Sequence, residues 1–509
     1  MREEINQQIQ SYLDKGYARK LTMTESQTRP PTTWYLLIFP VINPNKPGKV
    51  RVIFDAAAKV DGVALNTMLT KGHDMTASLL AILLRFRQKR VAISGDVAEM
   101  FHQVKVKEAD RHAQRFLYRF AETDDIQEYV LEVLTFGAAC SPCIAQYVKN
   151  KVAHTFDDIY REAVAVANDV YVDDQLKSTD TDDDGIRLGQ VITLIFAKAG
   201  YRIRNWTSNS RKVEAALNPE TQSSADVDIS GSSQTEKILG MFWRKSEDCF
   251  IFSLRFNNGN RDVLEGRKKA TKRQLLVIQM SIFDPLGLLQ HFIINMKLLI
   301  QDLWRTGSDW DQEVSTEHQA QFEEWASHFQ EVEALKIPRS YLGRPSNWDN
   351  ITAEPHIFVD AGKDAYAAAC YLRMVSSSGI ECRLVSAKSR VARIQFTSVP
   401  RLELEAARLG AQYAQVVKAS LEVRMTRTYF WTDSRTVLAW LTSDTRSNPS
   451  FVAHRIGYIQ DTTDIADWRW VPSSLNVADE ASKQRVKYEI KFDSRWYNGP
   501  DFLSQPNSN

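Results

Sequence analysis

The sequence has few cysteines, no long apolar run and almost no net charge. Its 509 residues include five cysteines, and the formal net charge is +1 at pH 7. So few cysteines exclude a disulfide-stapled extracellular fold and favour a reducing compartment. No segment approaches the roughly 18–20 consecutive apolar residues that a membrane span needs. The N-terminus, MREEINQQIQ, lacks the apolar core of a signal peptide, so we expect no membrane partner.

What the chain does contain is ordinary for a large folded protein. Hydrophobic residues make up 43% of the sequence and charged residues 25%, which excludes a wholly disordered or collagen-like chain. The length exceeds a single hydrophobic core, so we expect about two to four domains.

Charge is distributed unevenly along the first half of the chain. Residues 1–120 carry 19 Lys and Arg against 11 Asp and Glu, whereas residues 121–260 carry 14 against 22. A basic front followed by an acidic middle suits a protein that binds a polyanion and also holds divalent cations. Two solvated surfaces of opposite sign are the alternative, and composition does not distinguish them.

Changes in pattern divide the chain into three blocks and a tail. Residues 1–258 mix helix and strand signals, residues 259–350 are mainly helical, and residues 351–495 alternate strands with helices. The turn-rich stretch from Pro338 to Pro355 marks the second boundary. Residues 496–509 are assigned to a tail, and its segment NGPDFLSQPNSN (498–509) is predicted to be mobile.

Two polar segments interrupt the first two blocks. Asn218 to Gln234 is predicted to be an exposed loop, because it contains too few apolar residues to order itself. Arg261 to Arg273 contains the basic run RKKATKR. Its cations would contact a nucleic-acid backbone, or they form an ordinary solvated helix end.

Aspartates in the first block follow short apolar runs. Asp96 comes after VAISG, and Asp173 and Asp174 lie within the β-rich run VYVDDQL. Adjacent carboxylates repel, so such a pair is tolerated when a cation lies between the side chains or water screens them. A helix cap and an acidic turn are the structural alternatives. Carboxylates from two strands would be able to hold two Mg²⁺ ions, which is the arrangement for nucleotidyl transfer.

A resemblance to a known family spans almost the whole chain. Seven segments match polymerase motifs in order: RVIFDAAAK (51–59), LN (65–66), DVAEMFHQV (96–104), FGAACSP (136–142), YVDD (171–174), AGYRIRNWTSN (199–209) and LGMFW (239–243). FDPLGLL (283–289) and SAKSRVA…SVPRLELEAA (386–407) follow. In these segments the chain resembles the reverse transcriptase and RNase H region of a BEL/Pao-type LTR retrotransposon polyprotein.

The resemblance implies an α+β multidomain fold. Residues 1–258 would form the fingers and palm of a right-hand polymerase, and residues 259–350 a helical thumb or connection. Residues 351–495 would form an α/β RNase H-like domain. Neither a protease nor an integrase zinc motif is recognised, which would suit one piece of a longer polyprotein, and the sequence leaves this open.

The resemblance also assigns roles to residues of the first block. The catalytic and metal-binding carboxylates would be Asp96, Asp173 and Asp174. Residues matching substrate-binding positions are Arg51 on the triphosphate, Phe101 as a steric gate against a 2′-hydroxyl, Gly137, Ser141 and Pro142 beneath template and nucleotide, and Tyr171 of YVDD. A guanidinium at Arg51 suits phosphate, because it can donate to two oxygens at once.

The sequence departs from the family pattern at several positions. Phe136 stands where many reverse transcriptases have Gln, His73 replaces a usual Pro, and Ala57 replaces a usual Ser. Arg204 and Asn205 occupy a site where relatives commonly have Lys. None of these changes removes a metal carboxylate.

The third block has its own carboxylates. Asp360 and Asp433 each end an apolar strand, in HIFVDAG and YFWTDSR, and Asp479 lies just before or inside a helix in NVADEASK. In the helix predicted over RLELEAARLGAQYAQVV, Glu403 shares a face of small residues that could lie close to a sheet. Glu405, two positions on, points elsewhere and is better read as a partner of Arg408. We therefore choose Glu403 as the metal ligand.

Four carboxylates without His or Cys suit a hard ion such as Mg²⁺. Asp360, Glu403, Asp433 and Asp479 match the four acids of the RNase H fold, which would activate water against an RNA phosphodiester. The triplet Asp360-Ala361-Gly362 also invites an aspartic peptidase reading. A peptidase needs that triplet in a small β-rich domain paired with a second copy, so RNase H is the better interpretation.

The implied activity is RNA-directed DNA synthesis with ribonuclease H, using Mg²⁺ or Mn²⁺. Its partners would be an RNA template, a DNA primer, an RNA:DNA hybrid and deoxynucleoside triphosphates. The location would be the cytoplasm or a virus-like particle, with nuclear entry open, in a DNA integration pathway. The rivals are an inactive or domesticated nucleic-acid-binding relic and, less favoured, a Pao-type aspartic peptidase.

Overall fold

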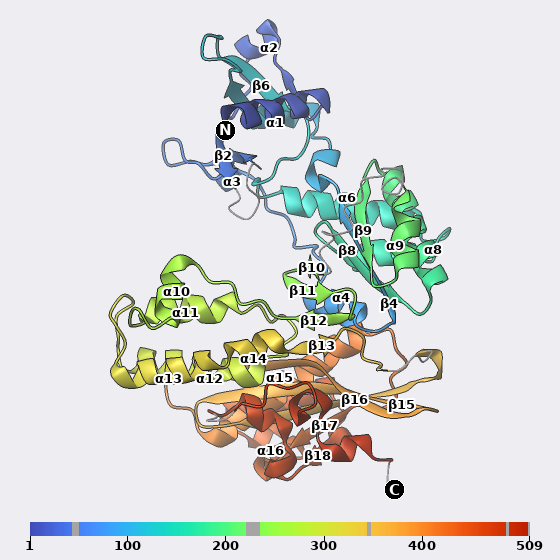
Figure 1. The fold of residues 1–509 in the computed structure, drawn as a ribbon, viewed down its shortest axis with the longest axis vertical. Coiled ribbons are helices and arrows are strands. Elements are labelled where there is room, and N and C mark those ends of the chain that lie inside the picture. The colour runs from blue at the N-terminus through green and yellow to red at the C-terminus, as the bar shows by residue number, and fades with distance from the viewer. Residues whose placement is uncertain (43–49, 220–234, 344–347, 485–487, 507–509) are drawn as a thin grey trace.

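The structure is a computed structural model of the chain, which describes residues 1–42, 50–219, 235–343, 348–484 and 488–506. An N-terminal lobe, a palm sheet with its helices, a helical segment and a C-terminal sheet follow one another through the molecule (Figure 1). Within the described ranges, no helix is both long and apolar enough to cross a membrane.

The N-terminal lobe has a core of its own. A three-stranded antiparallel sheet, ordered β1-β6-β5, lies beside the hairpin β2-β3. The bounds are α1 (Arg2–Asp14), β1 (Ala18–Lys20), α2 (Met23–Gln27), β2 (Leu37–Ile42), β3 (Val50–Asp55), α3 (Leu65–Met68), α5 (Glu108–Arg111), β5 (Arg115–Tyr118) and β6 (Gln127–Leu131). Helix α1 buries Ile9 and Tyr12 in this core, because the two side chains share one helical face.

The palm sheet is antiparallel throughout, in the order β7-β8-β4-β9. Its elements are α4 (Leu79–Phe86), β4 (Val91–Val97), α6 (Ser141–Thr155), α7 (Ala163–Asn168), β7 (Val170–Tyr171), β8 (Asp174–Thr179), α8 (Asp182–Lys198), β9 (Ile203–Ser208) and α9 (Arg211–Leu217). Along β4, Val91 and Ile93 enter the core shared with α6 and α8, whereas Ala92 enters the core on the other face. The sheet therefore separates two hydrophobic cores.

A small antiparallel sheet brings the helical segment back to the polymerase half of the chain. Its order is β10-β11-β12-β13. The bounds are β10 (Thr235–Ile238), β11 (Met241–Arg244), β12 (Cys249–Ile251), α10 (Asn258–Leu264), α11 (Lys272–Ser281), α12 (Gln290–Arg305), α13 (Thr316–Ser327), α14 (Phe329–Ala334) and β13 (Lys336–Pro338). Because β13 pairs with β12, both ends of the helical segment are fixed to the same sheet.

The C-terminal sheet is mixed, in the order β16-β15-β14-β17-β18. Three long strands form an antiparallel meander, and β17 and β18 then add in parallel beside β14. The bounds are β14 (Thr352–Ala361), β15 (Ala365–Ser376), β16 (Gly379–Val391), α15 (Val399–Ser420), β17 (Tyr429–Thr432), α16 (Arg435–Leu441), α17 (Ser450–Thr462), β18 (Trp468–Trp470), the 3₁₀ helix η8 (Val477–Ala481) and α18 (Arg495–Asn498).

The FDPLGLL segment fastens the helical segment to the C-terminal sheet. The half-buried Asp284 carboxylate accepts backbone N–H bonds from Leu288, at 2.7 Å, and Leu289, at 2.9 Å, at the start of α12. The Leu286 carbonyl accepts the Ala387 amide of β16 at 3.0 Å. Gly287 has φ +73°, and a Cβ there would lie 1.7 Å from the Ala387 carbonyl oxygen. The motif thus caps a helix and binds a sheet edge at once.

The prediction of a mobile segment is wrong for residues 498–506, which follow a buried aromatic pair and are held against the sheet. Trp496 and Tyr497 are fully buried, and the Trp496 indole donates to the Leu288 carbonyl at 2.8 Å. Arg373 of β15 donates to the Leu503 carbonyl at 2.8 Å. These apolar side chains and carbonyls order the segment against the sheet. Of the predicted loop Asn218–Gln234, residues 220–234 lie outside the described residues.

Replacing Gly287 with alanine should lower the free energy of unfolding, because it disturbs the contact between the segment before α12 and strand β16. The left-handed backbone costs about 1–2 kcal/mol for an L-residue, and the overlap with Ala387 adds roughly 1–3 kcal/mol. Gly307 is the matched control, because it has φ +72° but no atom within 4 Å of a new Cβ. Urea denaturation should show a clearly larger loss for Gly287→Ala than for Gly307→Ala. Equal losses would contradict the close approach.

Candidate active sites

The three predicted acids of the first block meet at the tip of the β7-β8 hairpin. Asp96 of β4 pairs in register with Asp174 of β8, and the Val97 amide donates to the Asp173 carbonyl at 2.8 Å. Asp173 lies in the turn between β7 and β8. Neighbouring strands lie about 4.8 Å apart, so all three carboxylates come from one small region of the sheet.

The hairpin turn contains a strained residue. Val172 has φ +56°, which is rare for a β-branched side chain and costs about 1–3 kcal/mol. Gln146 of α6 donates from Nε2 to the Val172 carbonyl at 3.1 Å, and this hydrogen bond stabilises the turn. Strain of this kind is found where a site needs an exact backbone position. Gln146 was not predicted from the sequence.

Burial and mutual repulsion alter the acidity of the hairpin carboxyls. Burial, followed by the charges of Asp173 and Asp96, raises the pKa of Asp174 from 3.8 to about 6. Burial and the Asp96 charge also raise the pKa of Asp173. Two acids whose charged forms are disfavoured together are suited to sharing a cation.

Asp96 has a cationic partner from the other neighbouring strand. Arg204 of β9 lies opposite Asp96 and donates from Nε to Oδ2 at 2.7 Å. This is the position where relatives commonly have Lys, so the departure places a guanidinium against the acid group. Among the residues that the structure describes, no three Asp, Glu, His or Cys side chains already surround one metal position.

The predicted substrate-binding residues fall into different surroundings. Arg51 is exposed on β3, and Tyr171 ends β7, where it pairs with Asp174. Phe101 is only 8% exposed and packs edge-to-face on Phe136, with ring centroids 4.7 Å apart. Phe136, the departure from Gln, is therefore the neighbour of the predicted steric gate.

The loop at residues 136–142 is held from the N-terminal lobe. Asn66 donates to the Gly137 carbonyl at 2.9 Å and accepts the Ala139 amide at 2.7 Å. Gly137 has φ +96°, which favours glycine. Ser141 is fully buried and its hydroxyl donates to the Thr135 carbonyl at 2.7 Å. It supports the loop by this bond, and Pro142 follows in the first turn of α6.

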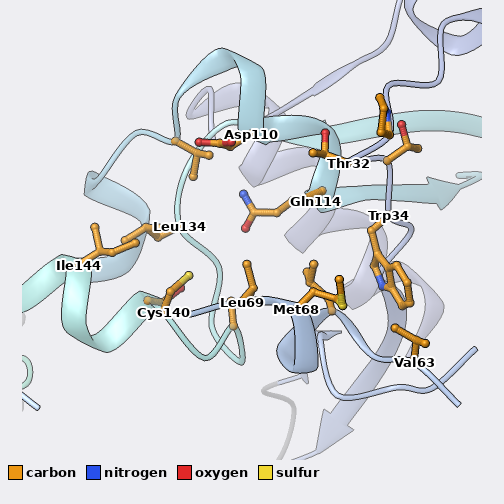
Figure 2. A pocket seen from close by; sticks show the side chains of 17 residues that line it. Thr32, Trp34, Val63, Met68, Leu69, Asp110, Gln114, Leu134, Cys140 and Ile144 are labelled. Carbon is orange, nitrogen blue, oxygen red and sulfur yellow. The ribbon is translucent and has the colours of Figure 1, made fainter. Parts of the chain in front are cut away.

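A cavity of about 640 Å³ lies between this loop and the N-terminal lobe. Figure 2 shows the amide of Gln114 pointing into it, with Asp110 above and Cys140 on the opposite wall. Most of the remaining wall is apolar, including Trp34 and Met68. Pockets of this size and polarity hold small organic groups in many proteins, but no predicted site residue except Ser141 lines this one.

The basic run at Arg261–Arg273 is partly neutralised inside the protein. Arg267 pairs with Asp262, and Arg273 with Asp311, each at 2.7 Å. Lys272 is buried, with its ammonium 4.0 Å from the centre of the Trp304 ring. Lys272 is therefore a packing residue. Its burial excludes the predicted contact with a nucleic-acid backbone for this residue.

The second acid group lies where the central strands of the C-terminal sheet end. Asp360 is near the end of β14, and Asp433 directly follows the parallel strand β17. Asp479 comes from η8, which packs beside β14 and β15. Parallel strands place their carboxyl ends at one sheet edge, so the chain topology brings these three acids together.

Glu403 joins the group from helix α15. Gly410 allows the helix close to β14, because a Cβ there would lie 2.5 Å from Val359 Cγ1. The Ser434 hydroxyl donates to the Glu403 carboxylate. Glu405 instead pairs with Arg408 at 3.2 Å and with Arg455 at 2.5 Å. The structure therefore separates the two glutamates as the helical spacing predicted.

Small polar groups and one lysine orient the acids. Ser473 donates to Asp433 at 2.6 Å, and Ser482 donates to Asp360. The Lys483 ammonium contacts Asp479 and lies 3.7 Å from Asp360 Oδ2. None of these three partners was predicted. The fragment NVADEASK contains two of them, because a serine and a lysine follow Asp479 within one turn.

Burial also dominates the acidity of this site. It raises the pKa of Asp360 to about 6, against the opposing influence of the Ser482 hydroxyl and the Lys483 charge. Burial likewise raises the pKa of Glu403, and the Asp433 charge raises it further.

The triplet Asp360-Ala361-Gly362 lies in a helix-covered mixed sheet, not in the small β-rich domain that a peptidase requires.

Two family models match successive parts of the chain. The reverse transcriptase (RNA-dependent DNA polymerase) model matches residues 44–241, and the Pao retrotransposon-like RNaseH-like domain model matches residues 271–434. The chain therefore contains a reverse transcriptase part followed by a Pao-type RNase H-like part. The first match contains every predicted residue of the polymerase site, and the second contains Asp360, Glu403 and Asp433. No curated protein matches the sequence.

Solved structures of a foamy viral protease-reverse transcriptase are similar to this chain in fold. The form designated dRH, in complex with double-stranded DNA, has a TM-score of 0.55 at 16% identity over 92% of this chain and 69% of that chain. The complex with an RNA/DNA hybrid has a TM-score of 0.55 at 14% identity over 96% and 55%. A further double-stranded DNA complex scores 0.52 at 15% identity over 92% and 82%.

These matches confirm the predicted fold class and family. The expected α+β chain with polymerase and RNase H-like parts is the architecture observed. The Pao-type match begins at residue 271 and so includes α11 and α12 together with strands β14 to β17 of the C-terminal sheet. This agrees with the contacts of FDPLGLL, which join those helices to β16. The roles of individual site residues stay predictions.

Neutralising Asp174 should stabilise the protein in the absence of divalent cations. A folded-state pKa near 6 instead of 3.8 means that the native state loses stability as pH rises from about 4 to 6. Asp174→Asn removes that loss, so in EDTA at pH 7.5 the variant should melt higher than wild type. The difference should shrink at pH 5. A lower melting temperature for Asp174→Asn in EDTA at pH 7.5 would contradict the cost of burying a charged Asp174 beside Asp173 and Asp96.

Proposed function

We propose that this chain copies an RNA or DNA template into DNA and cuts the RNA strand of an RNA:DNA hybrid. One observation carries the proposal. Two separate groups of acids gather at strand ends, one in the part that matches the reverse transcriptase model and one in the part that matches the RNaseH-like model. The foamy viral structures of this fold hold double-stranded DNA or an RNA/DNA hybrid, and we propose the same classes of partner. A primer and deoxynucleoside triphosphates complete the proposed substrates.

The palm acids fit a hard divalent cation, Mg²⁺ or Mn²⁺, because they offer only oxygen donors and repel one another without a cation. Asp96, Asp173 and Asp174 would hold it, and Asp96 can reach it when its side chain turns away from Arg204. Bound cations would promote loss of the primer hydroxyl proton and stabilise charge on the phosphates. Arg204 would then be free to donate to the triphosphate, as Arg51 would from β3.

The chain's own residues would also select the nucleotide. Phe101, which packs on Phe136, lies five positions after Asp96 and would oppose a ribose 2′-hydroxyl. The Gly137 loop would lie beneath the template, held by Asn66. Tyr171 continues the hairpin next to the acids. These roles follow from the family resemblance together with the observed packing.

At the C-terminal site, Asp360, Glu403, Asp433 and Asp479 would hold the cations that hydrolysis of RNA requires. Ser482, Ser434 and Ser473 each donate to one of the acids and so fix carboxylate orientation. Lys483 would have to move its ammonium away from Asp360 and Asp479, which its long flexible chain permits.

Primer extension tests the polymerase proposal. Asp173→Asn should reduce extension of a DNA primer on an RNA template by at least about 100-fold, because it removes a proposed cation ligand. Asp180→Asn is the control, since Asp180 lies just beyond β8 and pairs with Lys89 at 2.8 Å. It should extend like wild type. If wild type binds the hybrid but does not extend the primer, the relic reading replaces this proposal.

Cleavage of a labelled hybrid tests the second site. Glu403→Gln should reduce RNA cleavage by at least about 100-fold while primer extension continues, because the two acid groups are separate. Asp461→Asn, an exposed carboxylate in α17, serves as the control. Retained cleavage in Glu403→Gln would exclude Glu403 as a ligand. Peptide cleavage lost with Asp360→Asn but not with Asp173→Asn would favour the peptidase instead.

A further inference from the structure

The base of the catalytic hairpin is closed by a buried aspartate outside the acid group. Asp169 directly precedes β7 and is only 1% exposed. Its carbonyl accepts the Leu176 amide at 2.9 Å and the Gln175 side chain at 3.2 Å. These bonds fix the two strands that carry Tyr171 and Asp174 at the end opposite the turn.

Two cations hold the Asp169 carboxylate. Arg85, from the last turn of α4, donates from Nε to Oδ1, and Lys177 of β8 donates to Oδ2 at 2.8 Å. Arg85 also donates to the Asn168 carbonyl at 2.7 Å. Both cations are largely buried. Within the palm this group thus contains two positive charges and one negative charge, which is an unfavourable balance for buried groups.

The RNase H-like domain supplies the missing negative charge. Glu422 follows the end of α15 and its carboxylate pairs with the Lys177 ammonium. The Glu422 amide donates to Gln88 Oε1 at 3.2 Å, beside α4. The cluster Arg85, Asp169, Lys177 and Glu422 is therefore neutral only when the two domains are docked.

Helix α15 connects this contact with the second site. Glu403 lies near its first turn, and Glu422 follows its last residue, Ser420. At 1.5 Å per residue the helix is about 33 Å long. Its small-residue face packs closely on β14, and this packing fixes the helix to the sheet along its length. One end of α15 thus bears an RNase H acid, and the other end touches the base of the polymerase hairpin.

We propose that Glu422 of the RNase H-like domain, acting through Lys177 and Asp169, positions the hairpin that carries Asp173 and Asp174. The docked RNase H-like domain is then a positioning element of the polymerase site. Glu422 touches no reacting atom and is not a catalytic residue. This inference rests on the proposed polymerase function, and it adds an inter-domain contact on which the placement of the palm acids depends.

Neutralising Glu422 in the full chain tests the proposal. Glu422→Gln should lower kcat for single-nucleotide incorporation by about 3- to 10-fold, the effect of losing one charge-assisted contact on the hairpin. KM for the nucleotide, hybrid affinity and the RNA cleavage rate should stay within about twofold of wild type. Glu422→Asp should recover much of the loss, because it restores the charge.

A matched control distinguishes positioning from general destabilisation. Asp467 pairs with Arg427 at 2.5 Å inside the RNase H-like domain, so Asp467→Asn also breaks an ion pair there. It should leave kcat unchanged. An unchanged kcat in Glu422→Gln would overturn the proposal. So would an equal loss in Asp467→Asn, or a parallel fall in RNA cleavage and melting temperature.

A readout without catalysis separates this inference from the proposed function. Asp360→Asn combined with Asp433→Asn weakens the second site, and Mn²⁺ binding to the palm is then measured by electron paramagnetic resonance. Adding Glu422→Gln should weaken Mn²⁺ binding by about 3- to 10-fold. If the double variant binds Mn²⁺ but wild type extends no primer, the proposed function fails. Weaker Mn²⁺ binding on adding Glu422→Gln would still support the positioning role. Unchanged Mn²⁺ affinity would overturn the positioning role in either case.

Discussion

The burial of neighbouring carboxylates that also repel one another is the constraint on which both candidate sites depend. In the palm, Asp173 and Asp174 are adjacent in sequence, and Asp96 lies opposite Asp174 on the next strand. Near the C-terminus, Asp360 is 4% exposed among other acids. Holding such groups together requires a rigid frame, because the side chains would otherwise separate into solvent.

That frame is a core shared between domains. One hydrophobic cluster contains Ala92 of the palm, Phe250 of β12, Phe292 of α12 and Val359 of β14. Two buried arginines reinforce it. Arg339 donates to the Phe86 carbonyl and to Asp248 at 2.7 Å, while Arg87 donates to the Leu384 carbonyl of β16 at 3.2 Å. Polymerase and RNase H-like parts are therefore packed as one body, and the two acid groups have a fixed relation.

The local sequence pattern was sufficient to predict where some of the acids lie in the fold. Asp96 follows an apolar strand, so its place at a sheet end could be predicted, and the helical spacing of Glu403 distinguished it from Glu405. Both predictions depend on the period of one element, which the chain encodes locally.

Contacts between distant segments could not be predicted in this way. The pairing of Lys177 with Glu422, the burial of Trp496 against Leu288 and the bond from Ser482 to Asp360 depend on which surfaces meet after folding. Periodicity shows that a face is apolar or polar but not what covers it. The mobile-tail prediction was wrong for this reason, because a short Gly- and Pro-containing segment still carries aromatic side chains that find a partner.

The central claim is that one chain holds two acid-lined cation sites on a common frame. The most direct measurement is anomalous X-ray diffraction from crystals of the full chain with an RNA:DNA hybrid and Mn²⁺. The account predicts anomalous peaks beside Asp96, Asp173 and Asp174, and a separate group beside Asp360, Glu403 and Asp433. A bound hybrid with no anomalous peak at either acid group would contradict it.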